Sequence, residues 1–306
     1  MKELISDVIL NNSRAEMKKI NENDISAVFY NDLVGKIVSF GQKSFIGPSI
    51  GEVQPLKQPI GQVFAKKVGD IDFSSDDSTS FEIIEKIFPV DTNKTICKIT
   101  QEAFDDLESL KKLSDTKIDI LADFVEAQCG RKETKKILDL LLSECADGGS
   151  VTLADNIEES HFKLLQKINE LVVKINEKQF KTYEAFCVLP QSLPAGVALG
   201  ISFAYDYQMS TQEGKESDKY FLGRSGPVKF YVNPDPSVTE AIVGINSTKE
   251  HGVSSLIYCP YAINFSTVDD WRDGKRTIAI FTRNGYTINP LHDKAENPYL
   301  FKFTIG

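Results

Sequence analysis

Hydrophobic and polar residues follow two different spacings along the chain. From about residue 100 to residue 180, apolar residues recur every three or four positions, which is the spacing of a helix with one buried face. The longest such segment runs from Asn156 to Gln179 and carries lysines and glutamates on its other face. Its apolar stripe consists of Ile157, Leu164, Leu165, Ile168, Leu171, Val172 and Ile175. Further helices are predicted over residues 101–113, 117–129 and 133–146.

After Phe180 the spacing changes to short apolar runs separated by Gly, Pro, Asn and Asp, which is typical of strands joined by turns. These runs cover residues 185–189, 220–222, 228–232, 241–245, 257–261, 276–290 and 299–305. Asp273-Gly274 and Asn284-Gly285 suit tight turns with positive φ. Helices in the first half and strands in the second predict an α+β fold, with the last strand closing a sheet.

The N-terminal part is predicted to form an arm with little core of its own. Residues 1–50 are polar with few apolar positions, so they are expected to lie on the rest of the protein or on a neighbouring subunit. Pro55 and Pro59 favour an extended strap that leads into a strand over Gln62–Val68. The acidic, serine-rich residues 70–80 indicate a solvated loop, and a return strand is expected near Thr95–Ile99.

Composition narrows the function classes. The 306 residues are 41% hydrophobic and 26% charged, as in a soluble globular protein, and the net charge is −9. An acidic chain is a poor nucleic-acid binder, because binding requires clustered Lys and Arg to neutralise phosphates. No apolar N-terminal signal segment and no run of about 20 apolar residues is found, so we expect synthesis in the cytoplasm and no membrane span.

The five cysteines are scattered and form no CxxC pair, which predicts buried thiols in a reducing compartment rather than a metal or redox site. They are Cys97, Cys129, Cys145, Cys187 and Cys259.

The sequence contains no common catalytic or nucleotide-binding motif. Gly223-Arg224-Ser225-Gly226 resembles a nucleophile elbow only superficially, since Pro227 follows where a helix would begin. His161 is expected at a solvated helix start, His251 in a turn and His292 in a loop. A dispersed Ser/His/Asp triad, involving for instance Ser225 and His251, remains an alternative from the enzyme class. We therefore expect no enzyme activity, no metal and no cofactor.

Aromatic residues are frequent in the second half, and most are expected in the core. Trp271 and Arg272 lie in the polar segment between two predicted strands. Because Trp and Arg are enriched at the centres of protein contacts, these residues are either interface anchors or core residues.

Four segments, in order along the chain, resemble the major capsid proteins of T-even-type tailed bacteriophages. The best-matched stretch is Ile257–Tyr261 followed by Phe281–Pro290. The strap residues 53–65, the strand residues 228–233 and the tail residues 297–303 are similar to segments of the same family.

The resemblance implies the Hong Kong 97-type capsid fold, with regions in a fixed order. These regions are an N-terminal arm and strap (residues 1–62), an extended loop (63–115), the helices of a peripheral domain with a spine helix (116–182), an axial domain (183–275) and return strands of the peripheral domain (276–306). Relatives usually carry a cleaved N-terminal propeptide, and here about 50 residues precede the strap.

The resemblance also implies a function: a shell subunit that assembles into hexamers, and into pentamers, around a phage genome. Expected partners are other copies, portal, scaffold and vertex or decoration proteins, with DNA enclosed but not bound by sequence, no membrane, and the virion as location. Alternatives are a vertex paralogue, an encapsulin-like shell protein and a carbohydrate- or receptor-binding accessory protein. The residues expected at subunit contacts are Pro55, Pro59, Phe64, Trp271, Arg272, Arg283 and Tyr286.

Overall fold

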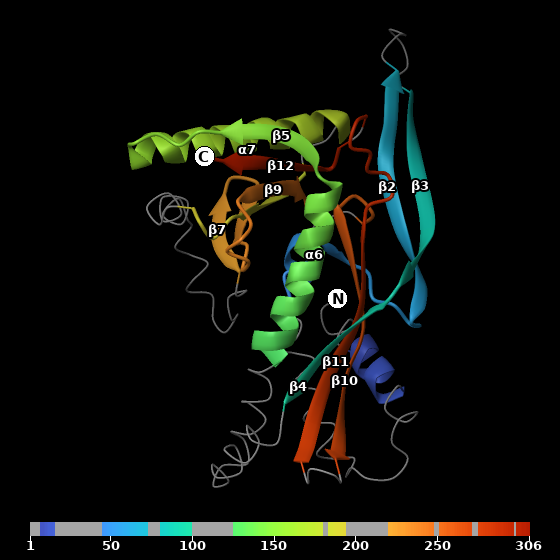
Figure 1. Ribbon diagram of the computed structural model, residues 1–306. Coiled ribbons are helices and arrows are strands. Elements are labelled where there is room, and N and C mark those ends of the chain that lie inside the picture. The colour runs from blue at the N-terminus through green and yellow to red at the C-terminus, as the bar shows by residue number, and fades with distance from the viewer. Residues whose placement is uncertain are drawn as a thin grey trace.

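The computed structural model contains two β-sheets, a long β-hairpin and two main helices (Figure 1). It describes residues 7–15, 45–72, 80–99, 125–179, 183–193, 220–247, 251–270, 275–296 and 298–306. The predicted helix over 101–113 and most of that over 117–129 lie outside these ranges.

The first sheet has four strands in the order β1-β10-β11-β4. They span Glu52–Val53 (β1), Leu256–Asp270 (β10), Lys275–Ile288 (β11) and Asn93–Ile99 (β4). Helix α6 (Arg131–Glu144), preceded by the π-helix Val125–Gly130, packs against this sheet. The prediction of helix 133–146 is confirmed, with the helix beginning and ending two residues earlier.

The predicted turn at Asn284-Gly285 is wrong. Both residues lie inside β11, where they pair with Pro260 and Cys259 of β10. Asn284 fits inside the strand because its side chain donates to Glu133. Gly285 fits because a Cβ at this position would lie only 2.8 Å from Val90 Cγ1. Tertiary contacts, not turn chemistry, explain this dipeptide.

The second sheet has six strands in the order β5-β12-β9-β6-β8-β7. They span Ala146–Val151 (β5), Ala185–Leu189 (β6), Phe221–Ser225 (β7), Val228–Val232 (β8), Glu240–Ile245 (β9) and Leu300–Ile305 (β12). The predicted strands therefore form, and the last of them, β12, lies between β5 and β9. Helix α7 (Ile157–Gln179) is the longest predicted helix, and the side-chain oxygen of Asn156 accepts a 2.9 Å hydrogen bond from the backbone N–H of Glu158 at its start.

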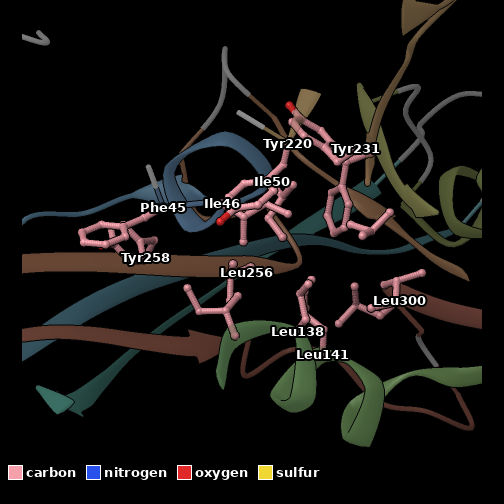
Figure 2. Packing of buried hydrophobic residues seen from close by; sticks show 14 of the residues in the cluster. Phe45, Ile46, Ile50, Leu138, Leu141, Tyr220, Tyr231, Leu256, Tyr258 and Leu300 are labelled. Carbon is pink, nitrogen blue, oxygen red and sulfur yellow. The ribbon is translucent and has the colours of Figure 1, made fainter. Parts of the chain in front are cut away.

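The second sheet is covered on both faces. Leu164, Ile168 and Leu171 of α7 pack with Cys187, Val243 and Phe303 on one face. On the other, Val188 and Leu300 join Leu138 and Leu141 of α6, the short helix α3 (Gly47–Ile50), and Leu256 and Tyr258 of β10 in a second core (Figure 2). Because the two cores share one sheet, α6 and α7 are fixed relative to each other.

Strand pairing differs from the expected division at residue 275. Ile257–Tyr261 and Thr277–Ile288 were expected in different domains, but β10 and β11 pair with each other from Leu256↔Ile288 to Asp270↔Lys275. The C-terminal strand β12 joins the six-stranded sheet instead of the sheet that holds β11. The long register places β10 and β11 in one sheet, on both sides of the expected boundary.

The hairpin consists of β2 (Ile60–Asp72) and β3 (Ser80–Asp91). From here on, "the arm" means this hairpin and not the N-terminal arm expected over residues 1–62. The predicted return strand near Thr95–Ile99 is a strand, but it is β4 and pairs with β11, whereas β3 returns along β2. The serine-rich residues 73–79 lie outside the described ranges. In Figure 1 the arm stands beside the body and its upper end extends beyond the two sheets.

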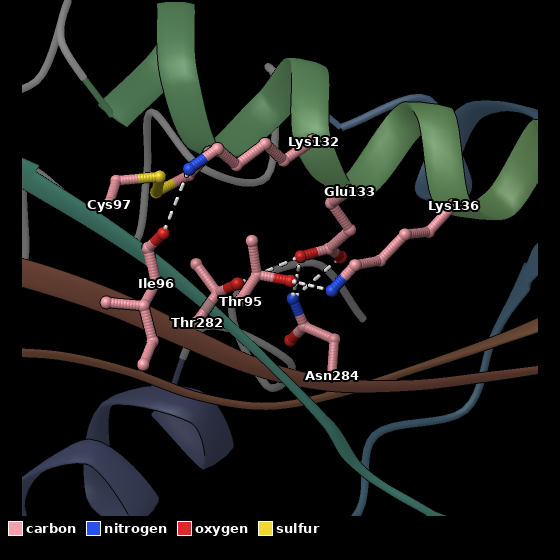
Figure 3. Close-up of a disulfide and its surroundings, with 9 residues drawn as sticks. Thr95, Ile96, Cys97, Lys132, Glu133, Lys136, Thr282 and Asn284 are labelled. Atoms are coloured by element: carbon pink, nitrogen blue, oxygen red, sulfur yellow. Dashed lines mark hydrogen bonds between the residues drawn. A yellow bond between two sulfur atoms is a disulfide. The ribbon is translucent and has the colours of Figure 1, made fainter.

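The cysteines follow the prediction only in part. Cys145, Cys187 and Cys259 are buried free thiols, as expected. Cys97 of β4 and Cys129 of the π-helix, however, form a disulfide, which corrects the expectation of five reduced cysteines (Figure 3). Their Cα atoms lie 6.0 Å apart, a separation that only the fold could reveal. Among the described helices, none has the length and apolar character that a membrane crossing requires.

Candidate subunit-contact surface

The inner face of the arm packs on the body. Val63 and Ala65 of β2 and Val90 of β3 are buried with Cys259 and Ala262 of β10. Strand alternation places these side chains on one face of the hairpin. The part of the arm nearest the body, which we call its root, is therefore attached through a small apolar core.

Hydrogen bonds from the strap reinforce the root. The Gln54 side chain donates through Nε2 to the Phe64 carbonyl at 2.9 Å, and its Oε1 accepts from the Phe64 N–H at 3.0 Å. One side-chain amide thus pairs with β2 as a neighbouring strand would. The strap, which was predicted from its prolines as an extended segment, holds the arm by this bond pair.

A turn of the body completes the root. The Lys66 N–H donates to the Gly252 carbonyl at 2.8 Å, and the Gly252 N–H donates to Glu52 Oε2 at 2.6 Å. Gly252 has φ +84°, and a Cβ there would lie 2.9 Å from the Lys66 nitrogen. Only glycine fits both constraints. His251 lies in this turn, as predicted, with Nδ1 3.2 Å from Glu52 Oε1.

The outer face of the arm carries exposed hydrophobic side chains. The register pairs Phe64 with Ile87 and Val68 with Ile83, and Ile60 lies on the same face because it is four residues before Phe64. The exposed fractions are 64% for Ile60, 55% for Ile83 and 66% for Ile87. A two-stranded ribbon with apolar residues on both faces is typical of an element that packs against a partner on the outer side.

Helix α7 carries a second exposed apolar strip. Phe162 and Val173 are 66% and 52% exposed and lie eleven positions apart, within about 20° of one another around the helix. Gln166 and Asn169 lie between them and are uncharged and exposed. The exposed residues Phe162 and Val173 lie beside the buried face of the helix. They are separate from the lysines and glutamates, which lie opposite that buried face.

The predicted contact residues fall in two groups. Pro55, Pro59 and Phe64 lie together in the strap and the root of the arm, where each is partly exposed. Pro59 also accepts a 3.0 Å hydrogen bond from the Thr92 N–H, which closes the base of the hairpin. Trp271 and Arg272 lie outside the described residues.

Arg283 and Tyr286 belong to β11. Arg283 Nε donates to Thr92 Oγ1 at 3.1 Å, and its guanidinium lies 5.8 Å from the centre of the Tyr261 ring. Tyr286 packs against the second core, which contains Leu256 and Tyr258, and burial raises its pKa to about 12. Both side chains thus support the sheet beneath the arm.

A buried carboxylate network fixes α6 to the sheet. Glu133 accepts from the Thr282 hydroxyl at 3.0 Å and from Asn284 Nδ2 at 2.8 and 2.9 Å (Figure 3). It also accepts from the Tyr258 hydroxyl at 2.7 Å. Burial raises the pKa of Glu133 above its ordinary value, while these bonds and Lys136 oppose that rise. Lys136 itself donates to Thr95 of β4 at 3.1 Å. The network therefore contacts β4, β10 and β11 at once.

The described residues give no support to a metal or hydrolase site. Within these ranges, no group of three or more His, Cys, Asp or Glu side chains could hold a metal ion. Ser225 ends β7 and Val228 begins β8, with Gly226 at φ +57° between them. This hairpin turn is not the strand-turn-helix that a nucleophile elbow requires. His292 donates from Nε2 to the Glu144 carbonyl and accepts the Tyr299 N–H at Nδ1, so its ring is occupied by structural bonds.

A solved phage capsid and a second solved structure from a phage share this fold. A chain from the capsid of Ralstonia phage GP4 aligns with a TM-score of 0.51 at 12% identity, covering 86% of this chain and 89% of that one. A chain from a structure of Mycobacterium phage Bobi aligns with a TM-score of 0.50 at 12% identity, covering 96% and 98%. The fold is the Hong Kong 97-type capsid fold, as the sequence resemblance implied.

A family model adds a match at the sequence level. Residues 195–305 match the model described as major capsid protein Gp23. This range includes strands β7 to β12 and the stretch Ile257–Pro290, where the sequence resemblance is best. No curated protein sequence matches the chain.

The sequence did not predict the exposed faces. Ile83, Ile87, Phe162 and Val173 were not among the expected contact residues, although all are visible as apolar positions. Two patterns point to them: the four-residue spacing of Ile83 and Ile87, which places both on one face of a strand, and the eleven-residue spacing of Phe162 and Val173 outside the buried stripe of α7.

Proposed function

We propose that the protein is the major capsid protein of a tailed bacteriophage, a structural subunit that assembles into the icosahedral head. The observation that carries the proposal is the combination of a Hong Kong 97-type fold over most of the chain with a match of residues 195–305 to the major capsid protein Gp23. The resemblance to T-even-type relatives supports the finer assignment. The protein acts by forming contacts and not by catalysis.

The arm provides the contact chemistry. Its outer face presents Ile60, Ile83 and Ile87 to solvent in the isolated subunit, and its root is held by the strap and by Gly252. A second copy of the chain covers this face in the shell. Burial of apolar area then makes each subunit more stable in the assembly than alone.

The two sheets support the following division of the chain into regions. The four-stranded sheet with α6 forms the peripheral domain, and the six-stranded sheet with α7 forms the axial domain. The helix that runs along the peripheral domain is then α6, not α7. Strand β12 belongs to the axial domain in this division, because its neighbours β5 and β9 lie there.

The charge balance suits a DNA container. With a net charge of −9, the chain has no excess of Lys and Arg to hold packaged DNA. The shell therefore encloses the genome without sequence-specific binding. Portal, scaffold, vertex and decoration proteins are the partners that such a head requires, and the particle forms in the host cytoplasm before it becomes a virion.

The proposal is tested by substitution on the arm. Ile87→Asn should abolish assembly into capsomers or shells, measured by sedimentation, because it places a polar group in the contact. Ile157→Asn, the same change at an exposed isoleucine at the start of α7, is the matched control and should assemble. Both changes are at exposed positions, so the free energy of unfolding should shift by about 0.5 kcal/mol or less. Unimpaired assembly of Ile87→Asn would remove the arm from the contact.

A shell protein with another content is the second candidate, since an encapsulin-like compartment has the same fold. The match to the Gp23 model favours the phage head. Finding nucleic acid inside purified particles supports the head, whereas finding a cargo enzyme supports the compartment.

A further inference from the structure

The outer edge of β10 is covered by three different segments. Strand β1 pairs with it only at Ile257 and Tyr258. The strap continues this cover, because the Gln54 N–H donates to the Tyr258 carbonyl at 2.9 Å and the Leu56 N–H donates to the Pro260 carbonyl at 3.1 Å. Beyond Pro260 the strap turns away toward the arm, so the edge needs another partner there.

A bulge lies at this point. The register of β10 with β11 shifts between Pro260 and Ala262, which leaves Tyr261 outside the ladder. Asn12, in the helix formed by residues 7–15, donates through Nδ2 to the Tyr261 carbonyl at 3.0 Å and to the Leu56 carbonyl at 2.8 Å. A side-chain amide nitrogen has two N–H groups, so Asn12 can bond to the bulge and the strap at the same time.

Two more residues on the same face of this helix hold it against β10. The Ser13 hydroxyl is fully buried and accepts a 3.0 Å hydrogen bond from the Ile263 N–H, the next backbone group along the edge. Ile9, four positions earlier, is 2% exposed and packs in the second core with Tyr258 and Ile263. Asn11 points elsewhere and is exposed. In Figure 1 this helix, in dark blue, lies beside β10 and β11.

We propose that residues 7–15 act as a clasp that locks the strap onto the edge of β10 and so fixes the root of the arm. The clasp acts through Asn12, which joins two carbonyls from segments about 200 residues apart in the chain. The strap residue that it holds, Leu56, packs with Val63 and Ala65 of the root. A released helix therefore frees the strap, and with it the arm that carries the exposed isoleucines.

The test uses full-length protein with Asn12→Asp, which keeps the shape of the side chain but removes both donors and places a charge beside two carbonyls. Asn11→Asp is the matched control, with the same charge change one position away on the exposed face. Hydrogen exchange should speed up by about tenfold or more at the Leu56 and Ile263 amides in Asn12→Asp, and stay unchanged in Asn11→Asp. Amides of β9 and β12 serve as an internal reference for global unfolding. If the amides of β9 and β12 also exchange faster, the measurement is repeated with the milder variant Asn12→Ala in place of Asn12→Asp.

Equal exchange at Leu56 and Ile263 in the two variants overturns the clasp. Faster exchange confined to residues 7–15 also overturns it, since the helix would then cover the edge without holding the strap. The link to assembly rests on the proposed function and is measured separately. Slower assembly of Asn12→Asp, with Asn11→Asp normal, supports the link; a clasp that is intact by exchange in a protein that never assembles would contradict only the proposed function.

Discussion

The Tyr258 hydroxyl donates a 2.7 Å hydrogen bond to Oε1 of Glu133, which joins the middle of the β10–β11 sheet to the first turn of α6. Thr282 and Asn284 donate to the same carboxylate from β11. Since α6 also packs on the six-stranded sheet through Leu138 and Leu141, this contact sets how the two sheets lie relative to each other. An apolar residue could fill the position of Glu133, but it would not fix the direction in which α6 lies on the sheet, as the hydrogen bonds of Glu133 do.

The first prediction concerns pH. Burial raises the pKa of Glu133 in the folded state above its ordinary value of 4.5, so the folded protein holds this proton more tightly than the unfolded chain. The resulting stability is fully present below the unfolded pKa and is lost as pH rises through the folded pKa. Glu133→Gln has no such proton, so the free energy of unfolding of the native protein should fall relative to this variant as pH rises from about 4.5.

Urea unfolding of both proteins, at a series of pH values, measures this difference. A native protein that gains stability over Glu133→Gln as pH rises would contradict the direction of the pKa shift. Glu133→Ala is the companion variant. It should cost about 3 kcal/mol near pH 4, because it leaves the donors of Tyr258, Thr282 and Asn284 without their acceptor. This cost should decrease at higher pH, where the native protein itself loses stability.

The second prediction concerns the root of the arm. Gly252→Ala should destabilise the protein by about 2 kcal/mol, because the new Cβ meets the Lys66 nitrogen and φ is positive. Gly226→Ala is the control: φ is also positive there, but nothing lies within 4 Å of the added Cβ. The difference between the two thermal denaturation midpoints isolates the contact with the arm. Equal midpoints would show that the turn at Gly252 does not restrain β2.

The third prediction concerns the disulfide between Cys97 and Cys129. Their separation of 32 residues implies that the crosslink stabilises the fold by about 3.7 kcal/mol through loop closure. A reductant should lower the unfolding midpoint of the native protein and leave that of a Cys97→Ala/Cys129→Ala variant unchanged. Similar losses in both proteins would mean that the reductant acts elsewhere.

The fourth prediction concerns Trp271, which follows the last residue of β10 and precedes β11 in the chain. As a proposed contact residue, it should affect assembly more than folding when replaced by alanine. Sedimentation measures the first and urea unfolding the second. Equal loss of assembly and of stability would assign Trp271 to the core.

Local patterns in the sequence predicted the elements but not all of their partners. The apolar stripe of α7 and the strands at 185–189 and 228–232 were predicted because their periodicity depends on burial alone. The pairing of β4 with β11, and of β12 with β5 and β9, depends on contacts between distant segments. The turn expected at Asn284-Gly285 failed for the same reason, since Glu133 and Val90 lie far away in sequence.

The buried carboxylate left a detectable sign. Glu133 precedes Ile137 by four positions and Leu141 by eight, so it lies on the apolar face of α6. A charged residue on such a face predicts a buried polar partner, although not which one. The disulfide left no comparable sign, because Cys97 and Cys129 have no motif spacing and only the fold places them together.

The most direct test of the proposed function is negative-stain imaging of the purified protein, with scaffold where assembly requires it. The native protein should form closed shells or rings built of hexameric capsomers, with Ile87→Asn failing to form them and Ile157→Asn forming them normally. A protein that stays strictly monomeric under all these conditions would contradict the proposed capsid function.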